Sequence, residues 1–264
     1  MKGSKFGFTL VEVSLFLGVT ALLFFGVTLG VRGSIFQQRY NDSVQNFADF
    51  LRTIYSETMN VEHGGTGRSD RAIYGKLVTF GETYGLDGSK ITDGETHIFS
   101  YTVVGHVGGL GFGDALSSLK NLSANVAIEK GSTFSLAGVA EEYVTRWGAE
   151  IQTTAGYSSG YKPFTGSILI VRHPQSGTVN TYYYASTIQV NKTLATGTDT
   201  AKRNLLSGKL SSSNFKQEGI DFCVNPLGKT KSDARRNIRL VANARNASAV
   251  EIINQDDSEN RCKK

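Results

Sequence analysis

The chain has 264 residues, of which 39% are hydrophobic and 19% are charged, and its formal net charge is +5. This length allows one sizeable domain or two small ones with a packed core, and no low-complexity tract is long enough to form a separate disordered domain. The basic excess is a C-terminal feature, because residues 200–264 hold 13 Lys or Arg against 7 Asp or Glu.

The first predicted element is an apolar helix over residues 8–31, which follows a short basic leader at residues 1–7. Its 24 residues carry one charge, Glu12, and would form a helix of about 36 Å, long enough to span a membrane. A cleavable secretory signal has a shorter apolar core that ends in small residues, so we expect no ordinary signal cleavage here. A carboxylate in hydrocarbon is costly, so Glu12 must either find a partner or reach the headgroups.

Residues 32–62 are predicted to continue this helix in amphipathic form. Apolar residues recur at steps of three and four among polar ones, which is typical of a helix with one buried face. The stripe consists of Phe36, Tyr40, Val44, Phe47, Leu51, Ile54 or Tyr55, and Met59. The helix should end before the HGGTG run at residues 63–67, where a globular domain over residues 63–264 begins.

The motif GFTLVE, from Gly7 to Glu12, resembles the class III signal of type IV prepilins and of the pseudopilins of type II secretion. The resemblance implies that a prepilin peptidase cuts between Gly7 and Phe8 and methylates the new amine of Phe8. It also implies that Glu12 faces the terminal amine of a neighbouring subunit during assembly, which would neutralise both charges. Many pilins have a proline in this helix; here no proline precedes Pro163, and glycines take its place.

Beyond residue 67 the sequence turns to short runs rich in β-branched and aromatic residues, which predict strands. The predicted strands are 74–80, 97–104, 125–128, 149–153, 167–172, 179–190, 220–224, 238–242 and 249–253. The clearest feature is a hairpin over residues 166–190, and residues 193–213 are expected to form an exposed loop. We therefore predict the α+β class and, from the resemblance, a pilin fold: a long helix packed on an antiparallel β-sheet domain.

The two cysteines, Cys223 and Cys262, both lie in the last quarter of the chain. In an exported chain an isolated pair indicates a disulfide, with two unrelated buried thiols as the alternative. The C-terminal region would then be closed by this bond.

A basic cluster precedes the second cysteine and contains one acid, Asp233. Its members are Lys229, Lys231, Arg235, Arg236, Arg239 and Arg245. We interpret the cluster as a solvated edge strand, protected against aggregation by its charges, with a DNA-binding patch as the alternative. The C-terminal half also resembles minor pilins of the GspH and FimT kind, but ARNAS at residues 244–248 departs from the GRxR motif with which FimT-like competence pilins bind DNA.

Catalytic motifs are not found. The four histidines show no HExxH spacing, and the sequence contains no GxSxG elbow and no Walker-type phosphate loop. Asp87-Gly88 and Asp93-Gly94 are interpreted as turns rather than metal ligands, so we expect no enzyme activity, no cofactor and no metal.

These features together predict a structural subunit of a type IV pilus-type filament. The alternatives are a pseudopilin of type II secretion, a DNA-uptake pilin and, outside the family, a signal-anchored surface protein that never polymerises. The expected partners are other pilin subunits, the peptidase, the assembly platform and, before assembly, the membrane, with DNA as a less favoured ligand. The chain would lie in the cytoplasmic membrane first and on the cell surface after assembly, where such filaments serve adhesion, twitching, secretion or DNA uptake.

Overall fold

A computed structural model describes residues 9–59, 72–106, 126–128, 140–153, 163–172, 178–198, 201, 205, 215–225, 235–244, 247–254 and 257–262. The chain divides into two compact units, Met1–Asp42 and Ser43–Lys264, called here the N-terminal and the C-terminal unit. Helix α1, Leu10–Met59, is continuous for 50 residues and belongs to both. The predicted helix over residues 8–62 is therefore present from residue 10 to residue 59, and its predicted ends lie outside the described residues.

The larger sheet of the C-terminal unit contains seven strands among the described residues, in the order β10-β7-β6-β1-β2-β3, with β4 also paired to β2. The strands are β1 (Ala72–Phe80), β2 (His97–His106), β3 (Val126–Ile128), β4 (Ala140–Val144), β6 (Gly166–Arg172), β7 (Val179–Tyr184) and β10 (Asn243–Ala244). Their pairings are antiparallel. The predicted hairpin is confirmed in its pairing, because β6 and β7 run together from Ser167 opposite Tyr184 to Arg172 opposite Val179.

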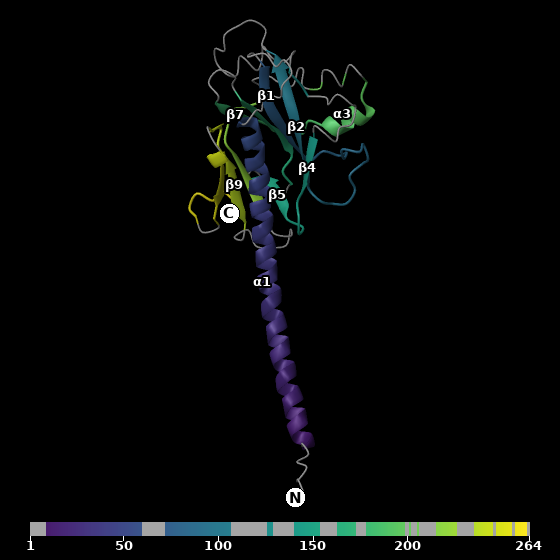
Figure 1. Ribbon diagram of the computed structural model, residues 1–264, viewed down its shortest axis with the longest axis vertical. Helices are drawn as coiled ribbons and strands as arrows, with labels where there is room; N and C mark the ends of the chain where they lie inside the picture. The colour runs from purple at the N-terminus through teal and green to yellow at the C-terminus, as the bar shows by residue number, and fades with distance from the viewer. Residues whose placement is uncertain are drawn as a thin grey trace, which may run out of the picture. The chain divides into compact units, whose positions relative to one another are not determined.

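A second sheet has the order β11-β9-β8-β5, again with antiparallel pairings. Its strands are β5 (Glu150–Thr153), β8 (Ile220–Asn225), β9 (Arg236–Leu240) and β11 (Val250–Ile253), and a short 3-10 helix, η3 (Ala247–Ala249), precedes β11. Strand β9 therefore lies inside this sheet, between β8 and β11. The helix-plus-antiparallel-sheet arrangement confirms the predicted α+β class (Figure 1).

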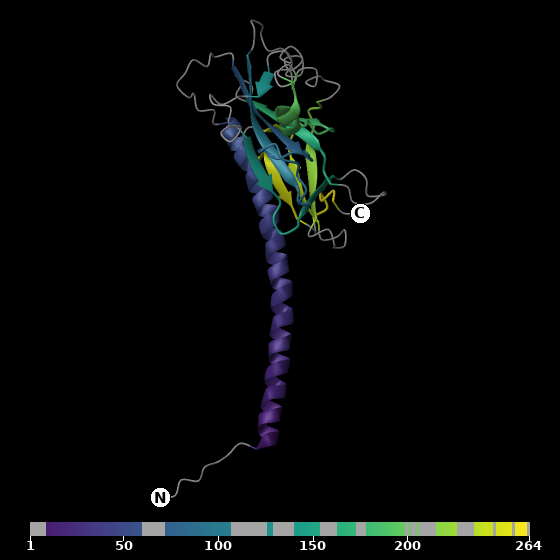
Figure 2. The same ribbon diagram turned by 90° about the vertical axis from the view of Figure 1, so that its right-hand side faces the viewer.

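The last turns of α1 pack against both sheets (Figures 1 and 2). Every side chain of one helical stripe is buried: Ser43, Val44, Phe47, Ala48, Leu51, Ile54, Tyr55 and Thr58. The ring of Phe47 lies 6.4 Å from that of Phe80 in β1 and 5.5 Å from that of Phe222 in β8, so one helical residue joins the two sheets. Arg172 of β6 donates to the carbonyl oxygen of Met59 at 2.8 Å and so satisfies one of the carbonyls left open at the end of the helix.

Two segments differ from the sequence-based prediction. The predicted strand 179–190 ends at Tyr184, and its last residue, Val190, instead begins a short helix, α3 (Val190–Thr196), which extends into the predicted loop over residues 193–213. The cause is a distant contact, because the backbone N–H of Asn191 donates to Oε2 of Glu82 at 2.7 Å. Strand β4, with the sequence AEEYV, was not predicted; its two adjacent glutamates hide the alternation of a strand.

Candidate functional site

The described part of the N-terminal unit exposes an apolar helix surface. Leu10–Thr28 is long and apolar enough to cross a membrane. Its large side chains are exposed within the chain, and an added Cβ at Gly18, Gly26 or Gly30 would meet nothing within 4 Å. A contiguous apolar surface of this size marks a membrane or protein interface, because water disfavours it.

Glu12 is held by a reciprocal hydrogen-bonded cap at the start of this helix. The backbone N–H and the hydroxyl of Thr9 both donate to Oε2 of Glu12, each at 2.9 Å, and the backbone N–H of Glu12 donates to Oγ1 of Thr9 at 3.3 Å. This is a capping box, with Thr9 as the N-cap residue and Glu12 three positions later. A carboxylate can accept about four hydrogen bonds, so the cap uses part of its capacity. Gly7 and Phe8 lie outside the described residues.

Cys223 and Cys262 form a disulfide, as the sequence predicted, with an S–S distance of 2.03 Å. Cys223 lies in β8, and Cys262 lies in the last described segment of the chain. Asp221 of the same strand is the centre of an ion-pair cluster: its side chain is 6% exposed and contacts Arg239 at 3.0 Å and Arg261 at 3.1 Å. The covalent bond and the charges fix the C-terminal segment to the second sheet.

Two described members of the basic cluster, Arg235 and Arg239, do not form the surface that the sequence indicated. Arg235 is fully buried, and the side-chain amide of Asn260 donates to its carbonyl oxygen at 3.0 Å. Arg239 contacts Glu259 at 2.8 Å as well as Asp221, and hydrogen bonds to these two carboxylates raise its pKa above the usual value. Arg236 is half-buried.

The interpretation as a solvated edge strand is therefore wrong, and two of the six basic residues do not fit the DNA-binding alternative. Strand β9 is interior to its sheet rather than an edge, and a phosphate-binding patch cannot use a buried Arg235 or an Arg239 that two carboxylates already neutralise. Lys229, Lys231 and Arg245 lie outside the described residues. Consecutive arginines look like a solvated surface in sequence, but the fold places the first of them in the interior.

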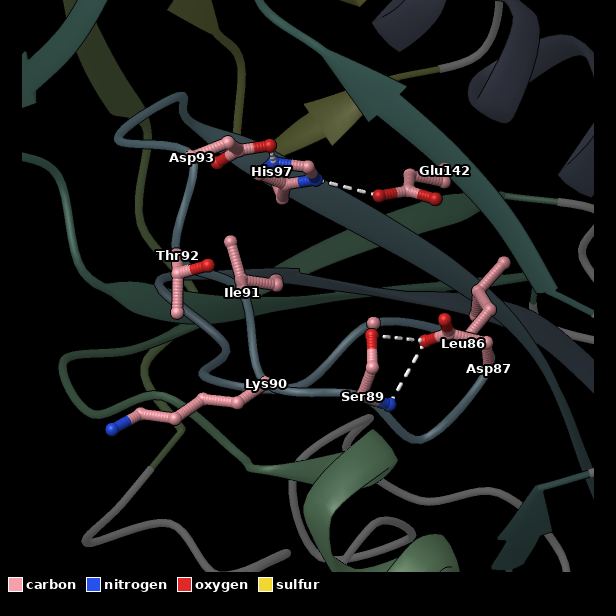
Figure 3. Close-up of a pocket in the computed structure, with 10 residues that line it drawn as sticks. Leu86, Asp87, Ser89, Lys90, Ile91, Thr92, Asp93, His97 and Glu142 are labelled. Carbon is pink, nitrogen blue, oxygen red and sulfur yellow. Dashed lines mark hydrogen bonds and ion pairs between the residues drawn. The ribbon is translucent and has the colours of Figure 1, made fainter.

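A hollow of about 470 Å³ lies beside the loop that joins β1 to β2, residues 81–96 (Figure 3). At one end of it, the imidazole of His97 lies between two carboxylates, with Nε2 2.7 Å from Oδ2 of Asp93 and Nδ1 2.6 Å from Oε1 of Glu142. Burial lowers the pKa of His97, but hydrogen bonds and charge from Glu142 and Asp93 outweigh it and raise the pKa above its usual value. The sequence did not predict this group, because Asp93-Gly94 is typical of a turn and nothing in the pattern links it to Glu142.

Glu82, at the start of the same loop, is another carboxylate that the sequence did not single out. It is 6% exposed and accepts hydrogen bonds from Thr79 at 2.5 Å and Tyr101 at 2.6 Å, besides the one from Asn191. Burial raises the pKa of Glu82 to about 7, and these hydrogen bonds oppose part of that rise. Its donors come from the end of β1, from β2 and from α3, so Glu82 connects three elements.

Compared with known proteins, the chain matches no family model, no curated protein and no solved structure.

Proposed function

We propose that the chain is a structural subunit of a type IV pilus-type extracellular filament, with a pilin fold in which α1 provides the assembly surface. The observation that carries the proposal is the exposed apolar segment Leu10–Thr28, which has Glu12 of the motif GFTLVE in its first turn. An anchor for a single protein needs this apolar length and can use the carboxylate at its start only for the capping box. A filament subunit uses the same apolar length and also gives the charge of the carboxylate a partner, the terminal amine of a neighbouring subunit.

In this proposal the apolar surface has two successive environments. The membrane first buries it in lipid, and sister helices then bury it in the filament, so the side chains remain away from water throughout. Cleavage after Gly7 would leave Thr9 as the second residue, so the capping box with Glu12 survives processing. The remaining hydrogen-bonding capacity of Glu12 would then receive the methylated amine of Phe8 from a neighbouring subunit.

The first experiment determines the N-terminus. Mass spectrometry of the chain from producing cells should find a polypeptide that begins at methylated Phe8. A chain that begins at Met1 or Lys2 would instead support a surface protein anchored by an uncleaved signal.

The second experiment separates the charge of Glu12 from its capping role. Glutamine also completes a capping box, so Glu12→Gln removes the charge and keeps the cap. We expect this variant to enter sheared filaments about tenfold less than the parent or worse, because one partner of a buried ion pair is lost. Asp42→Asn, which removes an exposed charge from the same helix, is the matched control and should assemble normally. Equal assembly of the Glu12→Gln variant would overturn the proposed role of this carboxylate.

A further inference from the structure

The loop that carries the His97 cluster places three potential metal ligands at alternate positions. Asp93, Glu95 and His97 are separated by one residue each; Asp93 and Gly94 form a bend, and His97 is the first residue of β2. Each offers one ligand atom, and these three atoms all lie within 4.8 Å of one another. In a tetrahedral shell with bonds of about 2.0–2.2 Å the ligand atoms lie roughly 3.4 Å apart, so the three side chains would adjust their positions around a bound ion.

The backbone of the loop supports this convergence. The backbone N–H of Glu95 donates to Oδ1 of Asp93 at 3.1 Å, which directs the other oxygen, Oδ2, to the imidazole. Between them Gly94 has a φ of +77°, a conformation that other residues rarely adopt. The turn that the sequence indicated is therefore also what brings two carboxylates to one histidine.

The fourth residue, Glu142, has a different part. A histidine that binds a metal through one ring nitrogen usually donates the other N–H to a carboxylate, which fixes the tautomer and the orientation of the ring. Glu142 of β4 meets this description, because its Oε1 lies 2.6 Å from Nδ1 of His97 while Nε2 faces Asp93. The side chain of His97 is 11% exposed, so its ring has little freedom, whereas that of Asp93 is 49% exposed and leaves an entry path.

We propose that Asp93, Glu95 and His97 form a divalent metal site that takes Zn²⁺, with Glu142 as a positioning residue. One imidazole nitrogen and two carboxylate oxygens suit zinc, and water completes a tetrahedral shell from the side of the hollow. Calcium and magnesium prefer shells made of oxygen alone. The ion would replace a proton on Nε2 of His97 and would bind the loop 81–96 to β2 and, through Glu142, to β4. This inference does not depend on the proposed filament function.

The test is a zinc titration of the full chain in detergent micelles, after treatment with a chelator and its removal. Isothermal titration calorimetry with ZnCl₂ should give one site per chain, and CaCl₂ under the same conditions should give markedly weaker binding. X-ray absorption at the zinc edge should show one imidazole in a shell of nitrogen and oxygen. No uptake of zinc by the parent chain would overturn the proposal.

The informative variant is Glu95→Gln, because it removes a ligand and leaves both ion pairs of His97 intact. We expect it to weaken zinc binding about tenfold or more, the range seen when groups at a metal site are lost. Glu141→Gln, an exposed neighbour of Glu142 in the same strand, changes the net charge equally and should bind zinc like the parent. If Glu95→Gln also binds like the parent, the zinc lies elsewhere and the proposed site is wrong.

His97→Gln gives a second measurement. We expect the imidazole signal in the absorption spectrum to disappear together with the binding, and circular dichroism checks that the variant is folded. A persistent imidazole signal in this variant would assign the zinc to another histidine and would contradict the proposal.

Discussion

The two parts of α1 have similar side chains and opposite surroundings. Phe24, in the N-terminal unit, is 74% exposed within the chain, whereas Phe47, in the C-terminal unit, is 1% exposed and packed among Phe80, Phe222 and Tyr143. Both lie on the same continuous helix. The C-terminal part of the helix is therefore part of the core of the C-terminal unit, whereas the N-terminal part exposes an apolar surface that no residue of the described chain covers.

The two parts also differ in how the helix is patterned. After residue 42 the polar residues leave one buried stripe, as expected for a helix on a sheet. Leu10–Thr28 is instead apolar on all sides, which in a stable protein requires lipid or other helices all round. The boundary between the two units therefore coincides with a change in what the helix is built to contact.

The largest effect expected from this comparison is on the stability of the domain. Phe47→Ala should lower the free energy of unfolding by about 3–5 kcal/mol, because it removes a buried ring between two sheets. Phe24→Ala should leave the same quantity unchanged. Denaturant unfolding of the full chain in micelles, followed by circular dichroism of the sheet signal, measures both. Equal effects of the two substitutions would break the comparison.

A smaller effect is expected on how the stability of the C-terminal unit depends on pH, and it comes from the buried Glu82. The folded-state pKa of Glu82 is about 7, above its ordinary value of 4.5, so the folded state holds the proton more tightly than the unfolded state. Its contribution to stability is full below pH 4.5 and is lost as the pH rises through about 7, a loss on the order of 3 kcal/mol.

Glu82→Gln should therefore flatten the dependence of stability on pH between about 4.5 and 7, as measured by thermal unfolding at several pH values. Glu141→Gln, at an exposed position of β4, is the matched control, and the stability of this variant should depend on pH as that of the parent does. A Glu82→Gln variant that keeps the slope of the parent would show that another group causes it.

The capping box provides the next test, and it concerns the N-terminal unit alone. Thr9→Ala removes the N-cap side chain and should destabilise the first helical turn by about 1 kcal/mol. Hydrogen exchange of the backbone amides in residues 10–13 should quicken, while the unfolding of the C-terminal unit should stay the same. Thr20→Ala is the control, because the hydroxyl of Thr20 donates within the helix, to the carbonyl of Phe16, and caps no end.

The smallest effect is expected at the surface of the C-terminal unit. Asp49 and Arg52 form an ion pair of 2.9 Å on the exposed side of α1, one helical turn apart. Because such pairs are screened by water, Asp49→Asn should change the free energy of unfolding by about 0.5 kcal/mol or less, and less still at high salt. A change as large as that of Phe47→Ala would mean that the solvated side of the helix also has a partner.

The elements that local pattern determines could be predicted from the sequence. The stripe through Val44, Phe47 and Leu51 has helical spacing, and the buried side chains follow it. The predicted stripe also includes Phe36, which is 40% exposed. Helical spacing alone does not predict at which residue the globular domain begins to cover the stripe. The β6–β7 hairpin was likewise predictable, since both strands and the turn residues between them are adjacent in the chain.

The features that long-range contacts determine could not be predicted in this way. Val190 begins a helix because Glu82, more than one hundred residues earlier, accepts the N–H of Asn191. Arg235 has the appearance of a surface residue in sequence but is fully buried, and the side-chain amide of Asn260, 25 residues later, donates to its carbonyl oxygen. At the candidate metal site the Asp93–Gly94 turn was predicted, but Glu142 reaches His97 only through the pairing of β4 with β2.

The disulfide also determines how the protein responds to force. Cys223 and Cys262 are 39 positions apart in sequence, and their Cα atoms are 5.5 Å apart. Fully extended, that segment would reach roughly 130 Å. A chain stretched between its two ends cannot release this length until the sulfur bridge is reduced, so the last strands of the second sheet are shielded from tension while the rest of the domain bears the load.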